Sequence, residues 1–406
     1  MSFVLSVYVP SLLFAIGQGV VIPFIPLIAR VLNSSVSMAA SIESMRGLGM
    51  VLFNMPAGFL VTRLGERTAM LLGTGVLVLV AFAASLVNTS AQFAVVLFVM
   101  GCAWSVWQLA RQSFVCEHTD KNMRGHVVSY IAAIFRLGAI IGPFLGTLLS
   151  HYWGFTSCFY LQAGACVIGS AVLCVAIPDD SSDVEPPSDT TICSVLVAHQ
   201  RVLLTAGLAS LCLTTMRASR LVIVDLWGTS LLGLSIEHVG LLIGISNALE
   251  LVLLYPAGWL SDKRGRLAVA IPCMLFFTIG LTMTVFSSTT LLFWISTLIS
   301  SVGNGLGSGI IMTIGIDLAP PDKRAEFLAI WRTLTDAGLL IGPALLGFVT
   351  STVSFPAGVA SIAITGILGL VILLLFVHET RPKEKEVHEI SEVESLLEVT
   401  SSVQTR

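Results

Sequence analysis

"PAGFLVTRLGER" at Pro56–Arg67 and "PAGWLSDKRGR" at Pro256–Arg266 are near-copies of one phrase, placed 200 positions apart in a chain of 406 residues. The same offset relates "GAIIGPFLG" at Gly138–Gly146 to "GLLIGPALLG" at Gly338–Gly347. A register that is kept across separate landmarks indicates an internal repeat rather than chance. We therefore expect the chain to consist of two copies of one module.

The composition indicates that this module lies in a membrane. Hydrophobic residues make up 55% of the chain and charged residues only 11%, whereas a soluble domain is about a quarter charged. The net charge is −3 and no basic block is present, so we expect no nucleic-acid partner. The eight cysteines lie mostly in apolar segments without a Cys-x-x-Cys spacing, which predicts packing residues and no metal or other cofactor.

Apolar segments of membrane-spanning length predict an all-α membrane protein with twelve transmembrane helices in two six-helix pseudo-repeats. We expect an N-terminal bundle over 1–177, a linker over 178–200, a C-terminal bundle over 201–377 and a tail over 378–406. The part of the linker from Pro178 to Thr191 is acidic and rich in Pro and Ser, which is typical of a flexible segment, and the tail has the composition of a disordered one. The predicted spans are 4–28, 38–62, 69–88, 91–114, 126–150, 155–177, 202–231, 236–260, 267–288, 291–316, 325–350 and 354–377.

The positions of Lys and Arg predict the orientation. Basic residues gather in the loops after the second, fourth, eighth and tenth spans, whereas the alternate loops hold only Arg30. By the positive-inside rule, both termini and the linker are cytoplasmic. The basic loop residues are Arg63, Arg67, Lys121, Arg124, Lys263, Arg264, Arg266, Lys323 and Arg324.

Two short patterns bear on the choice of membrane. Glu392 precedes Leu396 and Leu397 at the spacing of an acidic dileucine signal, which suggests a sorting adaptor as a partner. Asn33 and Asn88 match glycosylation acceptors on the outer side, but their loops are short and we assign no glycan. The plasma membrane and an endolysosomal membrane both stay open.

The repeated phrase resembles the loop signature of the major facilitator superfamily of secondary transporters, which reads Gly-x-x-x-Asp-Arg-x-Gly-Arg-Arg. The second copy matches well, while the first has Thr62 where the acid is expected. The resemblance implies two halves that rock about a site between them, and a loop that latches the cytoplasmic gate. It implies that a glycine here lets a helix of the other half approach closely, and that Arg67 meets Glu117 and Asp336. The matching loop residues are Gly58, Arg63, Gly65, Arg67, Gly258, Asp262, Gly265 and Arg266.

The fifth span resembles the drug/proton-antiporter branch of that family. Its Gly-x-x-x-Gly-Pro-x-x-Gly signature is present, but Leu97 stands where the branch carries an Arg in the fourth span. Small residues here predict tight helix packing, and a proline predicts a bend. The same packing explanation fits the glycine run Gly303–Gly309, which lacks the context of a nucleotide loop. The signature residues are Gly138, Gly142, Pro143 and Gly146.

Ionisable residues inside the spans are expensive and mark candidate sites. Glu43 with Arg46, and Arg332 with Asp336, are spaced to pair along one helix face. Two explanations fit the remaining charges: a buried structural network of Glu250, Asp225 and two arginines, or an anion-binding pair of arginines in a central cavity. These remaining charged candidates are Arg136, Arg217, Arg220, Asp225 and Glu250.

The family resemblance places the first, fourth, seventh and tenth spans around the central cavity. Polar and aromatic residues on these spans are therefore further candidates for contact with a solute. They are Gln18, Trp104, Trp107, Gln108 and Asn304.

We predict a monomeric secondary transporter of a small organic solute that works by alternating access, with proton coupling or none. Protons would be carried by Glu250 or Asp336, because no histidine is predicted at half-span. The alternatives are an organic-anion carrier that uses Arg217 and Arg220, a proton-coupled exporter of lipophilic or cationic compounds, and a sensor with the transporter fold. The sequence offers no ATP motif and no catalytic constellation, so we expect no enzyme. Membrane lipid, the solute and protons are the expected partners.

Overall fold

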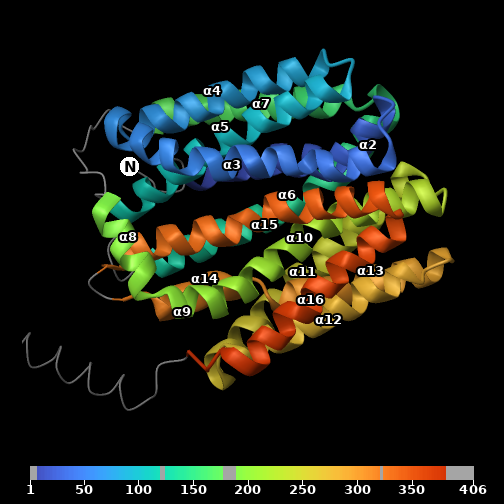
Figure 1. The fold of residues 1–406 in the computed structure, drawn as a ribbon. Coiled ribbons are helices and arrows are strands. Elements are labelled where there is room, and N and C mark those ends of the chain that lie inside the picture. Colours follow the sequence, from blue (N-terminus) through green and yellow to red (C-terminus); the bar gives the residue numbers. More distant parts are fainter. Residues whose placement is uncertain (1–6, 119–123, 177–188, 321–322, 381–406) are drawn as a thin grey trace, which may run out of the picture.

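The computed structural model describes residues 7–118, 124–176, 189–320 and 323–380. Twelve helices in this part of the chain are long and apolar enough to cross a membrane, which confirms the predicted all-α fold with two sets of six spans. The helices form one bundle, and α8 (Asp189–Ala198) lies at the same end of it as the C-terminal end of α16 (Figure 1). We call this end the terminal end and the opposite end the far end.

The N-terminal half contains the first six spans. The first span is α1, which continues through η2 into α2, and each later span is a single helix. The bounds are α1 (Val9–Val21), η2 (Ile22–Phe24), α2 (Ile25–Val31), α3 (Val36–Leu64), α4 (Glu66–Ser85), α5 (Ser90–Glu117), α6 (Arg124–Trp153) and α7 (Thr156–Ala176).

The C-terminal half repeats this arrangement with two irregular spans. Its seventh span contains two π-helical segments, η3 and η4, and its tenth span is split. The bounds are α9 (Gln200–Val202), η3 (Leu203–Gly207), α10 (Leu208–Leu226), η4 (Trp227–Leu231), α11 (Ile236–Arg264), α12 (Leu267–Val285), α13 (Thr290–Leu306), α14 (Ile310–Leu318), α15 (Arg324–Thr352) and α16 (Phe355–Phe376).

The segment predicted as a linker is not uniform. Residues 177–188 lie outside the described part, but Asp189–Ala198 form the helix α8, which lies at the terminal end beside α15 (Figure 1). The stretch predicted as flexible ends at Thr191, so α8 overlaps only its last three residues and lies mostly in the rest of the linker. Apolar residues such as Val195, which is buried, give α8 a face that packs.

The repeat extends to the residues that start and stop helices. Ser35 and Ser235 cap α3 and α11, and each accepts a backbone N–H three residues on. Gly65 and Gly265 end the same two helices with φ angles of 76° and 100°, a region that a side chain disfavours. The tight loop of the repeated phrase is thus fixed by one glycine in each half.

The glycine run in the tenth span breaks the helix. The sequence predicts an uninterrupted span, but α13 ends at Leu306 and α14 begins at Ile310, with Gly309 at φ 83° between them. Within the break, the carbonyl of Gly307 accepts the backbone N–H of Ile310 at 3.2 Å. The same carbonyl oxygen is used by the site described below.

Glycines of the Gly-x-x-x-Gly-Pro signature pack helices within each half. In α6, a methyl group on Gly138 would lie 2.5 Å from the backbone of Ala15 in α1. In α15, a methyl group on Gly342 would lie 2.5 Å from the carbonyl oxygen of Thr215 in α10. Both helices therefore use small residues for close backbone contact.

The two halves meet closely at the far end. There α3 packs against α15 and α6 against α11, and α3 and α15 run side by side through the bundle (Figure 1). A methyl group on Gly347 would lie 2.8 Å from the carbonyl oxygen of Ser37, and one on Gly244 would overlap the ring of Phe144. Nearer to half-span, a methyl group on Gly47 would lie 2.6 Å from the carbonyl of Leu339. We call these contacts the far gate.

The loop glycines at the terminal end have no such contact with the other half. A methyl group on Gly258 would meet nothing within 4 Å, and one on Gly58 would meet only Leu109 of its own half, at 3.7 Å. The expected approach of a helix from the other half is therefore absent here. The structure combines a closed far end with terminal-end loops that stand apart.

Candidate transport site

A buried ion pair lies at half-span in the C-terminal half. The Arg220 guanidinium in α10 donates to the Glu250 carboxylate in α11 at 2.6 Å and to the Ser301 hydroxyl at 2.7 Å. The Asn304 amide donates to the other oxygen of Glu250 at 2.7 Å. Arg220 and Glu250 are 4% and 5% exposed, so this pair is well bound and shielded. Removing one partner of such a pair leaves an uncompensated charge.

Arg136 in α6 links this pair to the N-terminal half. Its guanidinium lies 3.8 Å from the second oxygen of Glu250 and donates to the hydroxyl of Ser308. These contacts cross the interface between the halves, and no sequence pattern predicted them. The Glu250 carboxylate therefore lies within ion-pair distance of two guanidiniums, those of Arg220 and Arg136.

Arg217, one turn before Arg220, forms no ion pair with a carboxylate among the described residues. Its guanidinium donates to the carbonyl oxygen of Gly307 at 2.7 Å, where the tenth span is broken. Its Nε is buried without a hydrogen-bond partner among the described residues. This cation therefore keeps donor capacity for a further acceptor.

A second polar cluster joins the halves nearer the terminal end. Arg332 in α15 pairs with Asp336 at 3.4 Å, as their spacing predicted. It also donates to the Gln112 side chain of α5 at 2.5 Å, across the interface.

Arg111 belongs to the same region and was missed in the sequence. Its guanidinium lies 4.7 Å from the ring centres of both Trp107 and Phe135. Its Nη1 is buried without a hydrogen-bond partner among the described residues. The signal was its spacing four residues after Trp107, which places both side chains on one helix face.

The aromatic candidates mostly pack against one another. Trp107 stacks on Phe14 with ring centres 3.9 Å apart, and Trp104 stacks on the same ring at 5.2 Å. Gln18 is buried in α1, with its Nε2 unpaired among the described residues. Gln108 is part-buried on α5. Trp104 and Trp107 thus belong to an aromatic cluster in the N-terminal half.

Asp225 does not belong to the network around Glu250, so that part of the structural-network prediction is wrong. Five residues of α-helix turn through roughly 140°, so Asp225 leaves α10 on a different face from Arg220. It is fully buried toward the far end, in electrostatic range of Glu43. Glu43 accepts from Arg46 at 2.6 Å, as their spacing predicted.

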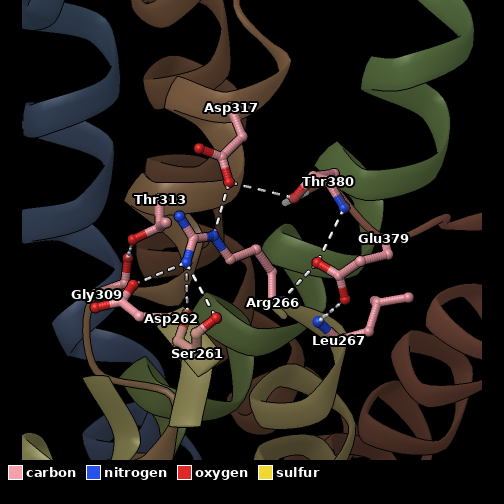
Figure 2. Close-up of polar contacts among 9 residues, drawn as sticks. All are labelled: Ser261, Asp262, Arg266, Leu267, Gly309, Thr313, Asp317, Glu379 and Thr380. Atoms are coloured by element: carbon pink, nitrogen blue, oxygen red, sulfur yellow. Dashed lines mark hydrogen bonds and ion pairs between the residues drawn. The ribbon is translucent and has the colours of Figure 1, made fainter. Parts of the chain in front are cut away.

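The loop of the C-terminal copy holds a compact network around Arg266 (Figure 2). The guanidinium donates to Asp317 at the end of α14 at 2.8 Å and to Asp262 at 3.0 Å. Burial lowers the pKa of Arg266, but the hydrogen bonds and charges of Asp317 and Asp262 outweigh burial and raise the pKa above its usual value.

The start of the predicted tail is bound to this loop. The Glu379 carboxylate accepts the backbone N–H groups of Arg266 and Leu267, at 2.7 and 3.0 Å, and Thr380 lies 3.4 Å from Asp317 (Figure 2). Residues 378–380 are therefore ordered by contacts, contrary to a tail that is disordered throughout. The sorting pattern at Glu392, Leu396 and Leu397 lies outside the described residues.

The N-terminal copy of the loop uses different contacts. Arg67 donates to the carbonyl oxygen of Cys174 at 2.9 Å, and Arg63 lies over the Phe59 ring. Glu66, at the place of Arg266, lies 3.8 Å from His118, one residue past the place of Asp317. The side chain of Glu117 lies outside the described residues, so its pairing with Arg67 stays a prediction.

Two like halves of six helices, with polar clusters joining them at half-span, define a membrane carrier of the twelve-helix class. The sequence profile of the Major Facilitator Superfamily matches residues 8–227 and 203–404, and the chain belongs to this family.

Relatives and solved structures agree with this class. The chain is 20% identical to an uncharacterized MFS-type transporter, MJ1560 of Methanocaldococcus jannaschii, over 85% of this chain and 90% of that one. It is 24% identical to the multidrug resistance protein MdtG of Klebsiella pneumoniae over 45% of this chain, a match that spans less than half (46%) of MdtG. Its fold matches the nucleoside transporter NupG (TM-score 0.75, 13% identity, 91% of this chain and 98% of that one) and a D-xylose-proton symporter (TM-score 0.72, 16% identity, 92% and 97%). The chain is a membrane transporter of solutes and not an enzyme.

Proposed function

We propose that the chain moves a small organic anion by alternating access, with Arg136, Arg217 and Arg111 as the groups that bind it. One observation carries this proposal, namely the charge balance of the two clusters between the halves. Arg220 and Arg332 each have a carboxylate partner, Glu250 and Asp336. The other three guanidiniums have no carboxylate to themselves. Arg136 lies near Glu250, which already pairs with Arg220; Arg217 donates to a backbone carbonyl; and Arg111 lies over two aromatic rings. Excess positive charge inside a membrane is costly, and a bound anion would offset it.

The aromatic surface supports a solute with an apolar body. Trp104 and Phe135 lie edge to face with ring centres 5.9 Å apart, next to Arg111. Such rings bind apolar or planar groups, while guanidiniums bind carboxylate or phosphate oxygens. We also propose that the terminal end is cytoplasmic, since the basic loops lie there; the structure then corresponds to an inward-facing state.

A proton-coupled exporter of lipophilic compounds is the second candidate. The likeness to MdtG, a multidrug resistance protein, favours it. Its proton carriers would be Glu250 and Asp336. Both carboxylates are bound to arginines in this structure, which favours their role as counter-charges.

Thermal unfolding of the purified protein with anionic, neutral and cationic solutes tests the proposal. We expect anions to raise the unfolding temperature, because a ligand at 100 times its Kd stabilises by about 2.7 kcal/mol. Arg217→Gln should abolish this shift, and Arg30→Gln, which alters a cation at the far end, should keep it. Stabilisation by lipophilic cations that survives Arg217→Gln would instead support the exporter.

A further inference from the structure

The buried carboxyl group of Asp225 has no role in the site described above. Asp225 is 0% exposed, and neither of its carboxyl oxygens has a hydrogen-bond partner in the described part of the chain. An ionised carboxylate in this position would lose its hydration with nothing in return, which costs several kcal/mol. A protonated carboxyl group avoids most of that cost.

Asp225 lies at the interface of the two halves, level with an acid of the other half. It is six residues before Leu231, where η4 ends at the far end, and Glu43 is seven residues after Val36, where α3 begins. At 1.5 Å per residue, both lie roughly 10 Å inside the far end. Helix α10 packs against α3, and Glu43 acts electrostatically on Asp225. The Oε2 atom of Glu43 is also buried and unpaired among the described residues.

No positive charge in the described surroundings neutralises Asp225. Helices α12 and α16, which pack against α10, contain no charged residues. Charged groups in the far-end and central parts of the other neighbouring helices are engaged elsewhere, and so are those of α10 itself; the remaining charged residues of α3, α11 and α15 lie in the turns nearest the terminal end. These engagements are Arg30 with the carbonyl of Ser34, Arg46 with Glu43, Arg217 with the carbonyl of Gly307, Arg220 with Glu250, Arg332 with Asp336, Glu237 with His151, and His238 with Ser235.

We propose that Asp225 is a proton-binding site that opens to the far-side solution, and that the far gate closes over it only after it has bound a proton. When the halves separate at the far end, water reaches Asp225 and the carboxyl group ionises. Closure removes that water and brings Asp225 beside Glu43, so an O–H bond must form at Asp225 with a proton from the far-side solution. Reopening returns the proton to water. The inference uses alternating access from the proposed function, but not the identity of the solute.

A second titratable pair at the far end must be separated from Asp225. His151 of α6 lies 2.8 Å from Glu237 of α11, and these side chains are 57% and 47% exposed. Protonation of His151 would also hold the halves together at low pH. An exposed pair contributes at most about 1 kcal/mol, so its effect on the gate should be the smaller one.

Cysteine accessibility in proteoliposomes tests the proposal without any solute. Ser41 lies against Gly347 in the far gate, so Ser41→Cys, with the native cysteines replaced, reports gate opening to an impermeant maleimide. Leu86→Cys, in an exposed turn of the N-terminal half, corrects for the reactivity of the thiol itself. We expect the ratio of the two labelling rates to rise with far-side pH, by up to about tenfold per pH unit for one linked proton.

Variants assign the pH dependence. Asp225→Asn should keep the ratio low and independent of pH, and His151→Gln should leave most of the rise in place. A wild-type pH profile in Asp225→Asn, or a flat one in His151→Gln alone, would overturn the proposal. Should Asp225→Asn fail to fold, Glu43→Gln supplies the test: removing the facing acid makes an ionised Asp225 less unfavourable in the closed gate, so the total rise of the ratio with pH should be smaller than in wild type. A ratio that follows sodium concentration at fixed pH would show that the site binds a metal cation instead.

Discussion

Equivalent positions in the two halves carry different chemistry. Trp104 of α5 stacks on an aromatic ring, whereas Asn304, 200 residues later in α13, donates to Glu250. Trp107 covers Arg111, whereas Gly307 offers its carbonyl to Arg217. The capping serines and loop glycines, by contrast, are the same in both halves. The residues that shape the helices have been kept. At these two interface positions the residues have diverged, to aromatic rings in the N-terminal half and to polar groups that bind charged side chains in the C-terminal half.

The largest expected loss of stability comes from removing the carboxylate that pairs with Arg220 in the C-terminal half. Glu250→Gln should destabilise the protein by about 3–5 kcal/mol, because Arg220 would stay buried without its counter-charge. Asp336→Asn is the matched control and should cost less, since Asp336 and Arg332 are 20% and 27% exposed. Thermal unfolding of both variants in detergent measures the difference, and equal losses would contradict the ranking.

The two loop copies should differ in the same direction. Arg266→Gln removes hydrogen bonds to two carboxylates and should cost about 1.5–3 kcal/mol. Glu66→Gln, at the equivalent place, should cost less, because its contact with half-exposed His118 is long at 3.8 Å. Chemical denaturation of both variants compares them.

The pH dependence of the Arg266 contribution follows from its raised pKa. A group whose folded-state pKa is raised stabilises at every pH below its unfolded value, which for arginine is already strongly alkaline. This contribution should therefore persist to strongly alkaline pH and be lost only as the pH rises through the raised folded-state pKa. A loss between pH 8 and pH 10 in wild type that is absent from Arg266→Gln would contradict it.

A smaller loss of stability is expected from changes in the aromatic cluster of the N-terminal half. Trp107→Phe keeps a ring over Arg111 but weakens the cation–π contact, which should cost about 1 kcal/mol. Trp104→Phe is its control, since the guanidinium of Arg111 lies over Trp107 and Phe135. If anion binding fails in Trp107→Phe while stability is kept, the ring acts on the solute as well as on the fold.

The smallest effect concerns the sixth helix of each half. Chain beyond α16 supplies Glu379 to the start of α12, whereas α7 supplies only the backbone carbonyl of Cys174 to Arg67. Glu379→Ala should therefore cost about 0.5 kcal/mol, the low end of the cost of losing a helix N-cap, because Glu379 is exposed. Glu379→Gln should recover part of the loss because an amide oxygen still accepts a hydrogen bond. Equal unfolding temperatures for wild type and Glu379→Ala would contradict this.

Much of the fold could be predicted from the sequence, because lipid demands long apolar helices and the repeat fixes their order. The pairings along one helix, Glu43 with Arg46 and Arg332 with Asp336, were also predictable, since they follow from helix geometry. Glu250, the partner of Arg220, could be predicted because it lies at half-span in the next helix.

Contacts between the halves could not be predicted in this way. Arg136 reaches Ser308 across 172 positions, and no local rule links such residues. Asp225 was misplaced because depth alone was considered, although five residues of helix rotate it away from Arg220. The break at Gly307–Gly309 escaped prediction because glycine fits both helix packing and a helix end.

The backbone contact at Gly47 and Leu339 bears on the electrical integrity of the membrane. One charge that crosses a potential of 100 mV releases about 2.3 kcal/mol, so a carrier that leaked ions in each cycle would dissipate the gradients around it. A separation too small for a methyl group leaves no room for a file of water at that point. At that depth the far gate therefore leaves no water path between α3 and α15, and Gly47→Ala would test whether a side chain as small as one methyl group raises the ion leak of proteoliposomes.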